Sequence, residues 1–257
     1  MIGNTNKYID EINEGIGFSR LPAINNEITS YILNEVNNQV IEKLKQLCPK
    51  YQIYMIEDSI FESFENIESS IWPKLFTKEQ RVLNKSAVEL IGEYLKKYLS
   101  NLLRREIIFG DYLGLGYPNF SLRVVRPNFI SDVGPLHADQ WFIDMGLQPL
   151  TKSIQNYQLC KLWLPIQSDP KLCNLLVIPN SHKQKNIYKY KIIKTQSGNK
   201  PAIANDIDQN QLVMIDNPPG SPLIFNMSLI HGGSLNKSNR CRVSMEFEFY
   251  ASKKSIF

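Results

Sequence analysis

The stretch PLIFNMSLIHGGSLNKSNRCRVSMEFEFY (residues 222–250) decides the fold that we predict for this chain. A short apolar segment ending near Asn226 is followed by a region rich in Gly, Ser and Asn, and then by RVSMEFEFY, in which polar and apolar residues alternate. Because successive strand residues point to opposite faces, this last strand has a polar face and an apolar face. Short strands separated by turn residues, with no helices between them, predict a β-sandwich or barrel.

The same pattern extends back toward residue 104. Short apolar or alternating segments, separated by Gly, Pro, Asn and Asp, predict strands over residues 106–109, 121–126, 136–142, 158–165, 175–178, 211–215, 222–226 and 242–250. We therefore expect a mainly β fold whose core is a jelly roll.

The N-terminal third predicts helices. Apolar residues recur at helical spacing from Ile28 to Leu47 and again from Val82 to Leu99. Thr77 is the expected N-cap of the second helix, and Gln80 completes a capping box. A third helix is expected over residues 58–69. We predict a single domain over residues 1–257, with mainly helical support in 1–103 packed on one face of a jelly-roll core in 104–257.

Composition and charge narrow the class of protein. The chain has 257 residues, of which 43% are hydrophobic and 21% charged, as in an ordered globular protein. The net charge of +4 gives no strong reason to expect nucleic acid or a membrane surface as a partner, and no apolar stretch is long enough to span a bilayer. We see no signal peptide, and the four scattered cysteines contain no C-x-x-C pair. These features favour a cytoplasmic protein with free thiols.

One charged segment interrupts the strands. HKQKNIYKYKIIKTQSGNK (residues 182–200) carries six lysines and no acidic residue. Runs of like charge are usually solvated, so we expect a surface loop. The alternative is a lid that attracts an anionic substrate such as a carboxylate or phosphate.

The three histidines of the chain include two with a metal-binding pattern. His137 and Asp139 lie two apart in PLHADQWF (residues 135–142), so a strand there would point both to the same face. His231 follows a predicted strand and can supply a third ligand. Two histidines and one carboxylate leave metal positions open for O2 and a keto acid, as in non-haem iron sites, although zinc could bind the same groups.

A site for the keto acid is predicted on the strand after His231. Arg242 can bind a carboxylate with two charge-assisted hydrogen bonds, and Ser244 on the same face adds a third donor. Arg240 has the same parity but lies in the turn NKSNR, so it ranks second. This pair favours 2-oxoglutarate as a co-substrate.

At this point the sequence resembles the phytanoyl-CoA dioxygenase family of 2-oxoglutarate oxygenases. The resemblance covers most of the chain: YIDEINEGIGFSRLPAI (residues 8–24), PLHADQWF (135–142), LCKLWLPI (159–166), LLVIPNSHK (175–183) and the closing segment from residue 222 each match a family motif. One departure is Asn180, where the family usually has Gly, and Asn tolerates the left-handed backbone that such a turn needs.

The resemblance implies a double-stranded β-helix that uses Fe(II), 2-oxoglutarate and O2. It implies that His137, Asp139 and His231 are the iron ligands, that Arg242 and Ser244 bind the far carboxylate of 2-oxoglutarate, and that His182 is a structural turn residue. Some members have a small residue in place of the carboxylate ligand and transfer halogen. Because Asp139 is present, we expect hydroxylation here, although demethylation, desaturation and ring formation start in the same way.

Candidate substrate contacts lie near these motifs. Gln140 and Trp141 follow Asp139, and strand alternation would turn Trp141 to the ligand face; Trp163 lies on the next predicted strand. Arg123 and Arg126, on the strand before, are candidates for the near carboxylate of 2-oxoglutarate or for an anionic substrate. Each aromatic could instead pack in the core, and each arginine could form a surface ion pair.

We therefore expect an oxygenase that hydroxylates a small polar or anionic metabolite and releases succinate and CO2. One alternative is a cupin-type metalloenzyme that uses the same three ligands without 2-oxoglutarate, and another is a non-catalytic jelly-roll binding module. The expected partner is a small molecule. The sequence identifies neither the substrate nor the oligomeric state.

Overall fold

A computed structural model describes residues 6–48, 59–62, 64–77, 80–147, 155–184, 186–195 and 198–255 of the chain. Its helices, with 3-10 turns written η, are α1 (Lys7–Asn13), α2 (Asn26–Leu47), η2 (Phe64–Asn66), α3 (Trp72–Leu75), α4 (Lys85–Leu103), η3 (Ile130–Asp132), α5 (Gln140–Asp144), η4 (Ser181–Lys183) and η5 (Gln209–Gln211). Its strands are β1 (Phe18–Arg20), β2 (Ile107–Phe109), β3 (Ser121–Val125), β4 (Tyr157–Gln167), β5 (Leu175–Val177), β6 (Tyr190–Thr195), β7 (Gly198–Ile203), β8 (Val213–Met214), β9 (Leu223–Asn226), β10 (His231–Gly233) and β11 (Arg242–Ser252).

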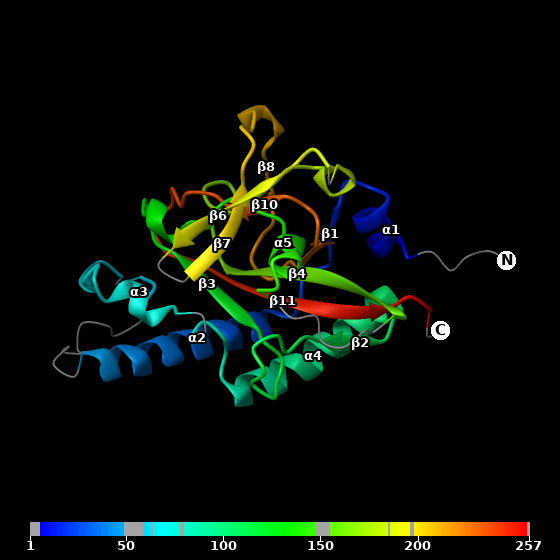
Figure 1. Cartoon of the computed structure of the whole chain (residues 1–257). Helices are drawn as coiled ribbons and strands as arrows, with labels where there is room; N and C mark the ends of the chain where they lie inside the picture. The colour runs from blue at the N-terminus through cyan, green and yellow to red at the C-terminus, as the bar shows by residue number, and fades with distance from the viewer. Residues whose placement is uncertain are drawn as a thin grey trace.

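The closing strand β11 is at the centre of the larger sheet (Figure 1). That sheet has the order β1-β9-β4-β11-β2, and β3 also pairs with β11. β11 pairs with β4 from Val243 to Ser252 and with β3 from Arg242 to Glu246, antiparallel in both cases. A smaller sheet has the order β10-β5-β8, and β6 and β7 form a two-stranded hairpin.

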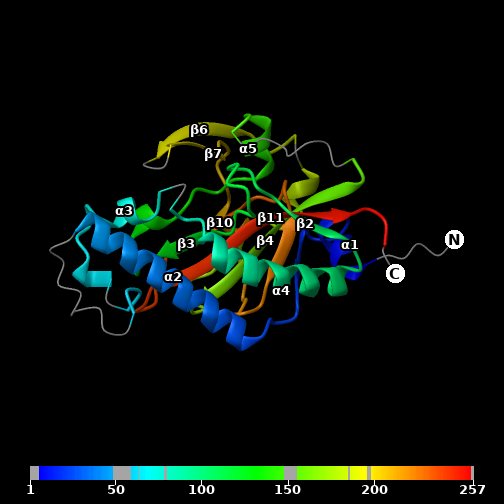
Figure 2. The ribbon, with the colours of Figure 1, turned by 90° about the horizontal axis from the view of Figure 1, so that it is seen from below.

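The helices α2 and α4 cover one face of the larger sheet (Figure 2). The apolar face of β11 points toward them, and its side chains are almost fully buried in the main core: Val243, Met245, Phe247 and Phe249. Burying each such side chain stabilises the fold by roughly 1.5–3 kcal/mol. The expected mainly β, jelly-roll fold with helices on one face is confirmed.

The other face of β4 and β11 points toward the smaller sheet. A second apolar cluster fills part of the space between the sheets: Phe18, Trp163, Leu175, Val177, Ile215, Leu223, Phe225 and Leu229. The polar residues of β11 share this side with the cluster, because they alternate with the residues that face the helices. The fold therefore directs Arg242, Ser244, Glu246 and Glu248 toward the space between the sheets.

The predicted start of the second helix is wrong. Thr77 does not cap it; α4 begins at Lys85, after the N-cap Asn84, whose side-chain oxygen accepts a hydrogen bond of 2.9 Å from a first-turn N–H. The preceding residues are held by β3 instead, because Val82 forms an isolated bridge with Ser121. Pairing with a strand thus prevents the helix from starting at the capping-box sequence.

Two other predictions need correction. The helix expected over 58–69 is reduced, among its described residues, to turns and the 3-10 turn η2 (residues 58 and 63 lie outside the description). The strand expected over 211–215 is only β8, preceded by η5. In the first segment Ile60, Phe64 and Ile67 do have helical spacing, but they are buried in the main core from turns, so tertiary packing overrides the local pattern. Asn180 does adopt the left-handed backbone expected of it, with φ 64°.

The lysine-rich segment is a β-hairpin rather than a loop. Among its described residues, η4 is followed by β6 and β7, which pair from Tyr190–Ile203 to Thr195–Gly198. The hairpin is attached next to the H-x-D motif, because the N–H of Ile203 donates to the carbonyl of Leu136 at 2.8 Å. The Tyr190 ring also packs on Trp141, with centroids 5.3 Å apart.

Among the described helices, none is long and apolar enough to cross a bilayer.

Candidate metal centre

The H-x-D motif does not lie on a continuous strand. His137 forms one isolated β-bridge, Asp139 has the helical angles φ −62° and ψ −29°, and the short helix α5 begins at Gln140. Gln140 donates to Asp144 at 2.9 Å, a contact between side chains four apart that stabilises the helical turn. The predicted strand over 136–142 is therefore wrong, and so is the alternation that placed Trp141 on the ligand face.

The backbone pairs the two distant histidines directly. The N–H of His137 donates to the carbonyl of His231 at 2.9 Å, and the N–H of His231 donates to the carbonyl of His137 at 2.8 Å. Their rings lie 4.5 Å apart, centroid to centroid. A β-bridge, rather than strand alternation, brings the candidate ligands together.

Hydrogen bonds also fix the tautomer of both histidines. Nδ1 of His137 lies 2.8 Å from the carbonyl oxygen of Pro135, and Nδ1 of His231 lies 3.0 Å from that of Leu229. A carbonyl only accepts, so each Nδ1 carries the hydrogen and each Nε2 is left with a lone pair. This is the usual arrangement for a histidine that binds a metal through Nε2.

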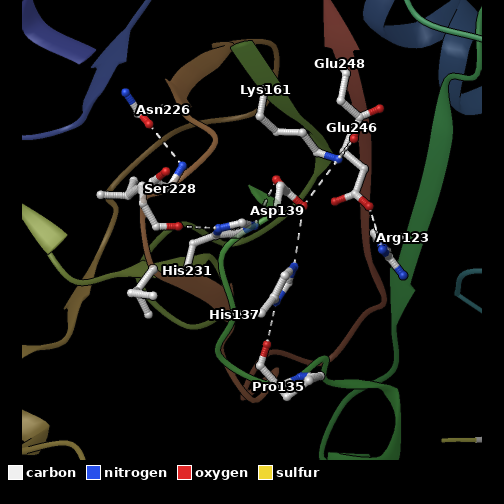
Figure 3. A network of polar contacts seen from close by, with 12 residues as sticks. Arg123, Pro135, His137, Asp139, Lys161, Asn226, Ser228, His231, Glu246 and Glu248 are labelled. Atoms are coloured by element: carbon white, nitrogen blue, oxygen red, sulfur yellow. Dashed lines mark hydrogen bonds and ion pairs between the residues drawn. The ribbon is translucent and has the colours of Figure 1, made fainter. Parts of the chain in front are cut away.

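The three side chains converge on one point (Figure 3). His137 Nε2 lies 3.6 Å from Asp139 Oδ1, and His231 Nε2 lies 3.7 Å from Asp139 Oδ2. One ligand atom from each residue lies within 4.8 Å of the others, as a shared metal ion requires. Asp139 Oδ2 is buried without a hydrogen-bond partner, so this oxygen fits a metal that would complete its contacts.

The charges of the triad suit a divalent cation. Burial lowers the pKa of His231 to about 4, so the ring is neutral at pH 7. Burial would raise the pKa of Asp139, but the Lys161 ammonium outweighs it and holds that pKa below its usual range, so the carboxyl is ionised. Two imidazole nitrogens and one carboxylate oxygen are the donors of a facial triad that leaves positions open on the metal.

Arg242 and Ser244 lie buried on the same side of β11. Arg242 is 4% exposed and its guanidinium lies against Gly233, where a Cβ would be 3.2 Å from Nη2. It donates to the carbonyl of Asn174 at 3.2 Å, but its Nε has no partner, and neither has the Ser244 hydroxyl. Among the described residues, no carboxylate lies within 4.0 Å of Arg242. Unpaired buried donors of this kind fit an anionic ligand. Arg240, the competing residue, is exposed.

Three charged residues that lie next to the triad were not predicted from the sequence. Lys161 on β4 is buried, with Nζ 2.6 Å from Glu248 Oε1 and 3.8 Å from Asp139 Oδ1 (Figure 3). Burial alone would lower the pKa of Lys161, but Asp139 and Glu248 raise it, so the side chain is an ammonium ion. Glu246 is the third. A signal was available, since a lysine in the apolar strand LCKLWLPI and two glutamates at alternate positions of β11 need buried partners.

Arg123 lies on the edge of this charged group. Its Nη2 is 2.6 Å from Glu246 Oε1, and its side chain is 35% exposed. Although burial would raise it, the pKa of Glu246 falls to about 2 because Arg123 and Lys161 stabilise the carboxylate. Lys200 of β7 is close enough to be affected: burial first, and then repulsion by Arg123, lower its pKa to about 8. The hairpin thus brings a second cation toward Arg123.

The guanidinium of Arg126 is buried and makes its contacts within the protein interior. Its guanidinium forms two hydrogen bonds of 2.8 Å to Asp132, and its carbon lies 3.8 Å from the Phe129 ring centroid and 4.6 Å from that of Trp72. The side chain is 4% exposed. A guanidinium with these partners has little capacity left for a substrate.

The remaining candidate contacts have packing roles in the structure. Trp163 is 2% exposed within the cluster between the sheets, and Trp141 is 8% exposed and packs with Tyr188 and Ile230. Gln140 is partly buried at the start of α5. His182 is buried, with Nε2 3.1 Å from the carbonyl of Asn13, which agrees with a structural role.

This fold and this site define an oxygenase of the 2-oxoglutarate-dependent non-haem iron class. The match to a protein family is more specific and runs over residues 52–244, well over half of the chain. The chain belongs to the phytanoyl-CoA dioxygenase (PhyH) family. No curated protein sequence matches it significantly.

Solved structures share the fold at low sequence identity. The non-heme monooxygenase ThoJ, in its apo form, is 12% identical with a TM-score of 0.58, over 96% of this chain and 79% of that one. EvdO2 from Micromonospora carbonacea var. aurantiaca is 13% identical with a TM-score of 0.54, over 100% and 95%. EctD from S. alaskensis, solved with 2-oxoglutarate and 5-hydroxyectoine, is 13% identical with a TM-score of 0.51, over 91% and 72%. At such identities the likeness concerns the fold alone.

Proposed function

We propose that this protein hydroxylates a small polar or anionic metabolite, with Fe(II) held by His137, Asp139 and His231 and with 2-oxoglutarate and O2 as co-substrates. The observation that carries the proposal is the buried Arg242, which has no carboxylate partner among the residues that the structure describes and lies on the same side of the sheet as the triad. When bound, the iron and the keto acid supply the oxidising chemistry, and the protein supplies position and shielding.

Each residue has a defined part in this proposal. The Nδ1 hydrogen bonds of His137 and His231 keep the Nε2 lone pairs directed at the metal position. Asp139 supplies the negative ligand in place of a halide, which favours hydroxylation over halogen transfer. Arg242 and Ser244 bind the far carboxylate of 2-oxoglutarate, which satisfies their unpartnered donors.

The first experiment is an anaerobic titration of the apo-protein with Fe(II) and then 2-oxoglutarate, followed by the visible absorption band of the iron–keto acid chelate. Arg242→Met should raise the dissociation constant of 2-oxoglutarate by about 30-fold or more, from loss of roughly 2 kcal/mol of charged hydrogen bonding. His231→Ala should abolish the band. Arg240→Met, at an exposed arginine of the same parity, is the matched control and should behave like wild type.

The outcomes separate the candidate functions. Fe(II) binding without any 2-oxoglutarate band would favour the cupin-type enzyme, and no metal binding would favour the binding module. Equal effects of Arg242→Met and Arg240→Met would remove the assigned carboxylate site. Family membership and the buried Arg242 favour the oxygenase over both alternatives.

Support for a polar or anionic substrate comes from two cations, Arg123 and Lys200, next to Glu246. Arg123 is about one-third exposed and Lys200 has no carboxylate within 4.0 Å among the described residues. Two neighbouring cations can be bridged by an anion. We expect small acids to stimulate succinate formation more than their neutral amides do, and Lys200→Gln to reduce that preference. Equal stimulation by acids and amides would contradict this substrate class.

A further inference from the structure

A buried cation stands directly behind the carboxylate of the candidate metal centre. Lys161 Nζ lies 3.8 Å from Asp139 Oδ1, and the lysine side chain is 7% exposed (Figure 3). Glu248 Oε1 accepts a hydrogen bond from the same ammonium at 2.6 Å, so the nitrogen is held at a fixed place. Glu248 is itself 5% exposed. These three charges form a buried row that leads from β11 through β4 to the H-x-D motif.

The two oxygens of Asp139 have different surroundings. Each oxygen faces one histidine Nε2, but only Oδ1 also lies near the Lys161 ammonium, whereas Oδ2 is buried and has no hydrogen-bond partner. Asp139 also lies at the start of α5, but its side chain makes no capping hydrogen bond to that helix. Local backbone contacts therefore do not orient this carboxylate, and Lys161 is the cation placed to do so.

We propose that Lys161, anchored by Glu248, is a positioning residue that holds the Asp139 carboxylate through Oδ1 and leaves Oδ2 directed at the metal. This inference rests on the proposed function, because it takes Asp139 as a metal ligand. Partners of this kind orient a ligand without touching the metal, and their loss typically weakens metal binding about 10–100-fold.

A purely structural ion pair makes a different prediction. If Lys161 only balanced Glu248 and Asp139, its removal would leave more negative charge near the metal, and Coulomb attraction alone would strengthen cation binding. Positioning predicts weaker binding, so the sign of the change separates the two roles. The variant Lys161→Met/Glu248→Gln removes one charge of each sign, so a role limited to their mutual pairing predicts wild-type binding.

The test uses Co(II) alone as the probe, with its dissociation constant and its visible spectrum as readouts on the apo-protein. We expect Lys161→Met and the double variant both to bind Co(II) about 10–100-fold more weakly than wild type. Their Co(II) spectra should differ from wild type, because the carboxylate is no longer held in one orientation. Lys85→Met/Glu89→Gln removes an exposed ion pair of the same two residue types on α4 and is the matched control, with wild-type binding expected.

Three results would overturn the proposal. These are equal or tighter Co(II) binding by Lys161→Met, wild-type binding and spectrum in the double variant, and an equal loss in the control variant. If Lys161→Met fails to fold because Glu248 is left buried and unpaired, the double variant alone decides. Failure of wild type to bind Co(II) would instead count against the proposed function, so the two failures are distinguishable.

Discussion

Replacing Asp132 by Asn should destabilise the fold strongly without altering the metal site. Asp132 accepts three hydrogen bonds from Arg126: from Nε at 2.8 Å, from Nη2 at 2.8 Å and from the backbone N–H at 3.1 Å. The two side chains are 4% and 7% exposed. The guanidinium is also enclosed by the Phe129 and Trp72 rings, so it has no route to water once its partner is lost.

The size of the effect follows from this burial. Removing one partner of a buried ion pair typically costs 3–5 kcal/mol, because an uncompensated charge is left inside. An Asn side chain keeps the shape but turns an NH2 group toward the guanidinium at one of its two positions. For a chain of this size each kcal/mol lowers Tm by about 2–4 °C, so we expect a decrease of roughly 6–20 °C.

Urea and thermal unfolding of the apo-protein, together with Fe(II) affinity, test this prediction. The control is Glu89→Gln, which removes an exposed ion pair with Lys85 whose side chains are 66% and 64% exposed at 3.8 Å. Such a pair contributes well below 1 kcal/mol. The reasoning is refuted if Asp132→Asn unfolds like Glu89→Gln, or if it raises the KM for 2-oxoglutarate while leaving Tm unchanged.

Three further predictions concern other parts of the molecule. Burial holds the pKa of His231 at about 4 against an ordinary 6.5, so the unfolded state binds more protons between these two pH values. The free energy of unfolding of the chelator-treated protein should therefore fall by up to about 3 kcal/mol as the pH decreases from 6.5 to 4. If urea unfolding of His231→Gln shows the same dependence on pH, His231 is not the cause. Asn84→Ala should lower the free energy of unfolding in urea by about 1 kcal/mol, because it removes the N-cap of α4. Asn84→Asp keeps a capping oxygen and should be close to neutral, so equal losses in both variants would exclude capping as the cause. Gly17→Ala should lower the free energy of unfolding by at least about 2 kcal/mol, because φ of Gly17 is +98° and a Cβ there would lie 2.5 Å from the His182 ring. An unchanged urea unfolding midpoint would show that this turn can relax.

Much of the fold was readable from strand alternation and helical spacing. The alternation in β11 correctly separates the residues that face the helices from Arg242 and Ser244, because each face has a different environment along its whole length. The spacing from Ile28 to Leu47 likewise predicts α2. Long, strongly periodic segments carry enough residues for one pattern to dominate.

The short segments were not readable in this way. His137, Asp139 and Trp141 have the spacing of a strand, but the chain turns into α5 after a single bridge. The capping box at Thr77 fails for a related reason, since the residues that follow it pair with β3. In both places tertiary contacts between distant segments override the local pattern.

The charged partners of the site depend on pairing across strands. Lys161 meets Glu248 because β4 and β11 align these two residues, and Arg123 meets Glu246 from β3. A single sequence reveals that such residues need partners, but the register that supplies the partners is set by the whole sheet.

The reciprocal backbone bridge between His137 and His231 has a consequence for the order of events during biosynthesis. Its two hydrogen bonds join two segments that are far apart in the sequence, so the nitrogen ligands meet only after the chain through His231 has been made. A nascent chain that ends before His231 therefore lacks the assembled set of candidate metal ligands. Once the bridge has closed, the ligands are already in place, and loading the ion requires little further loss of chain entropy.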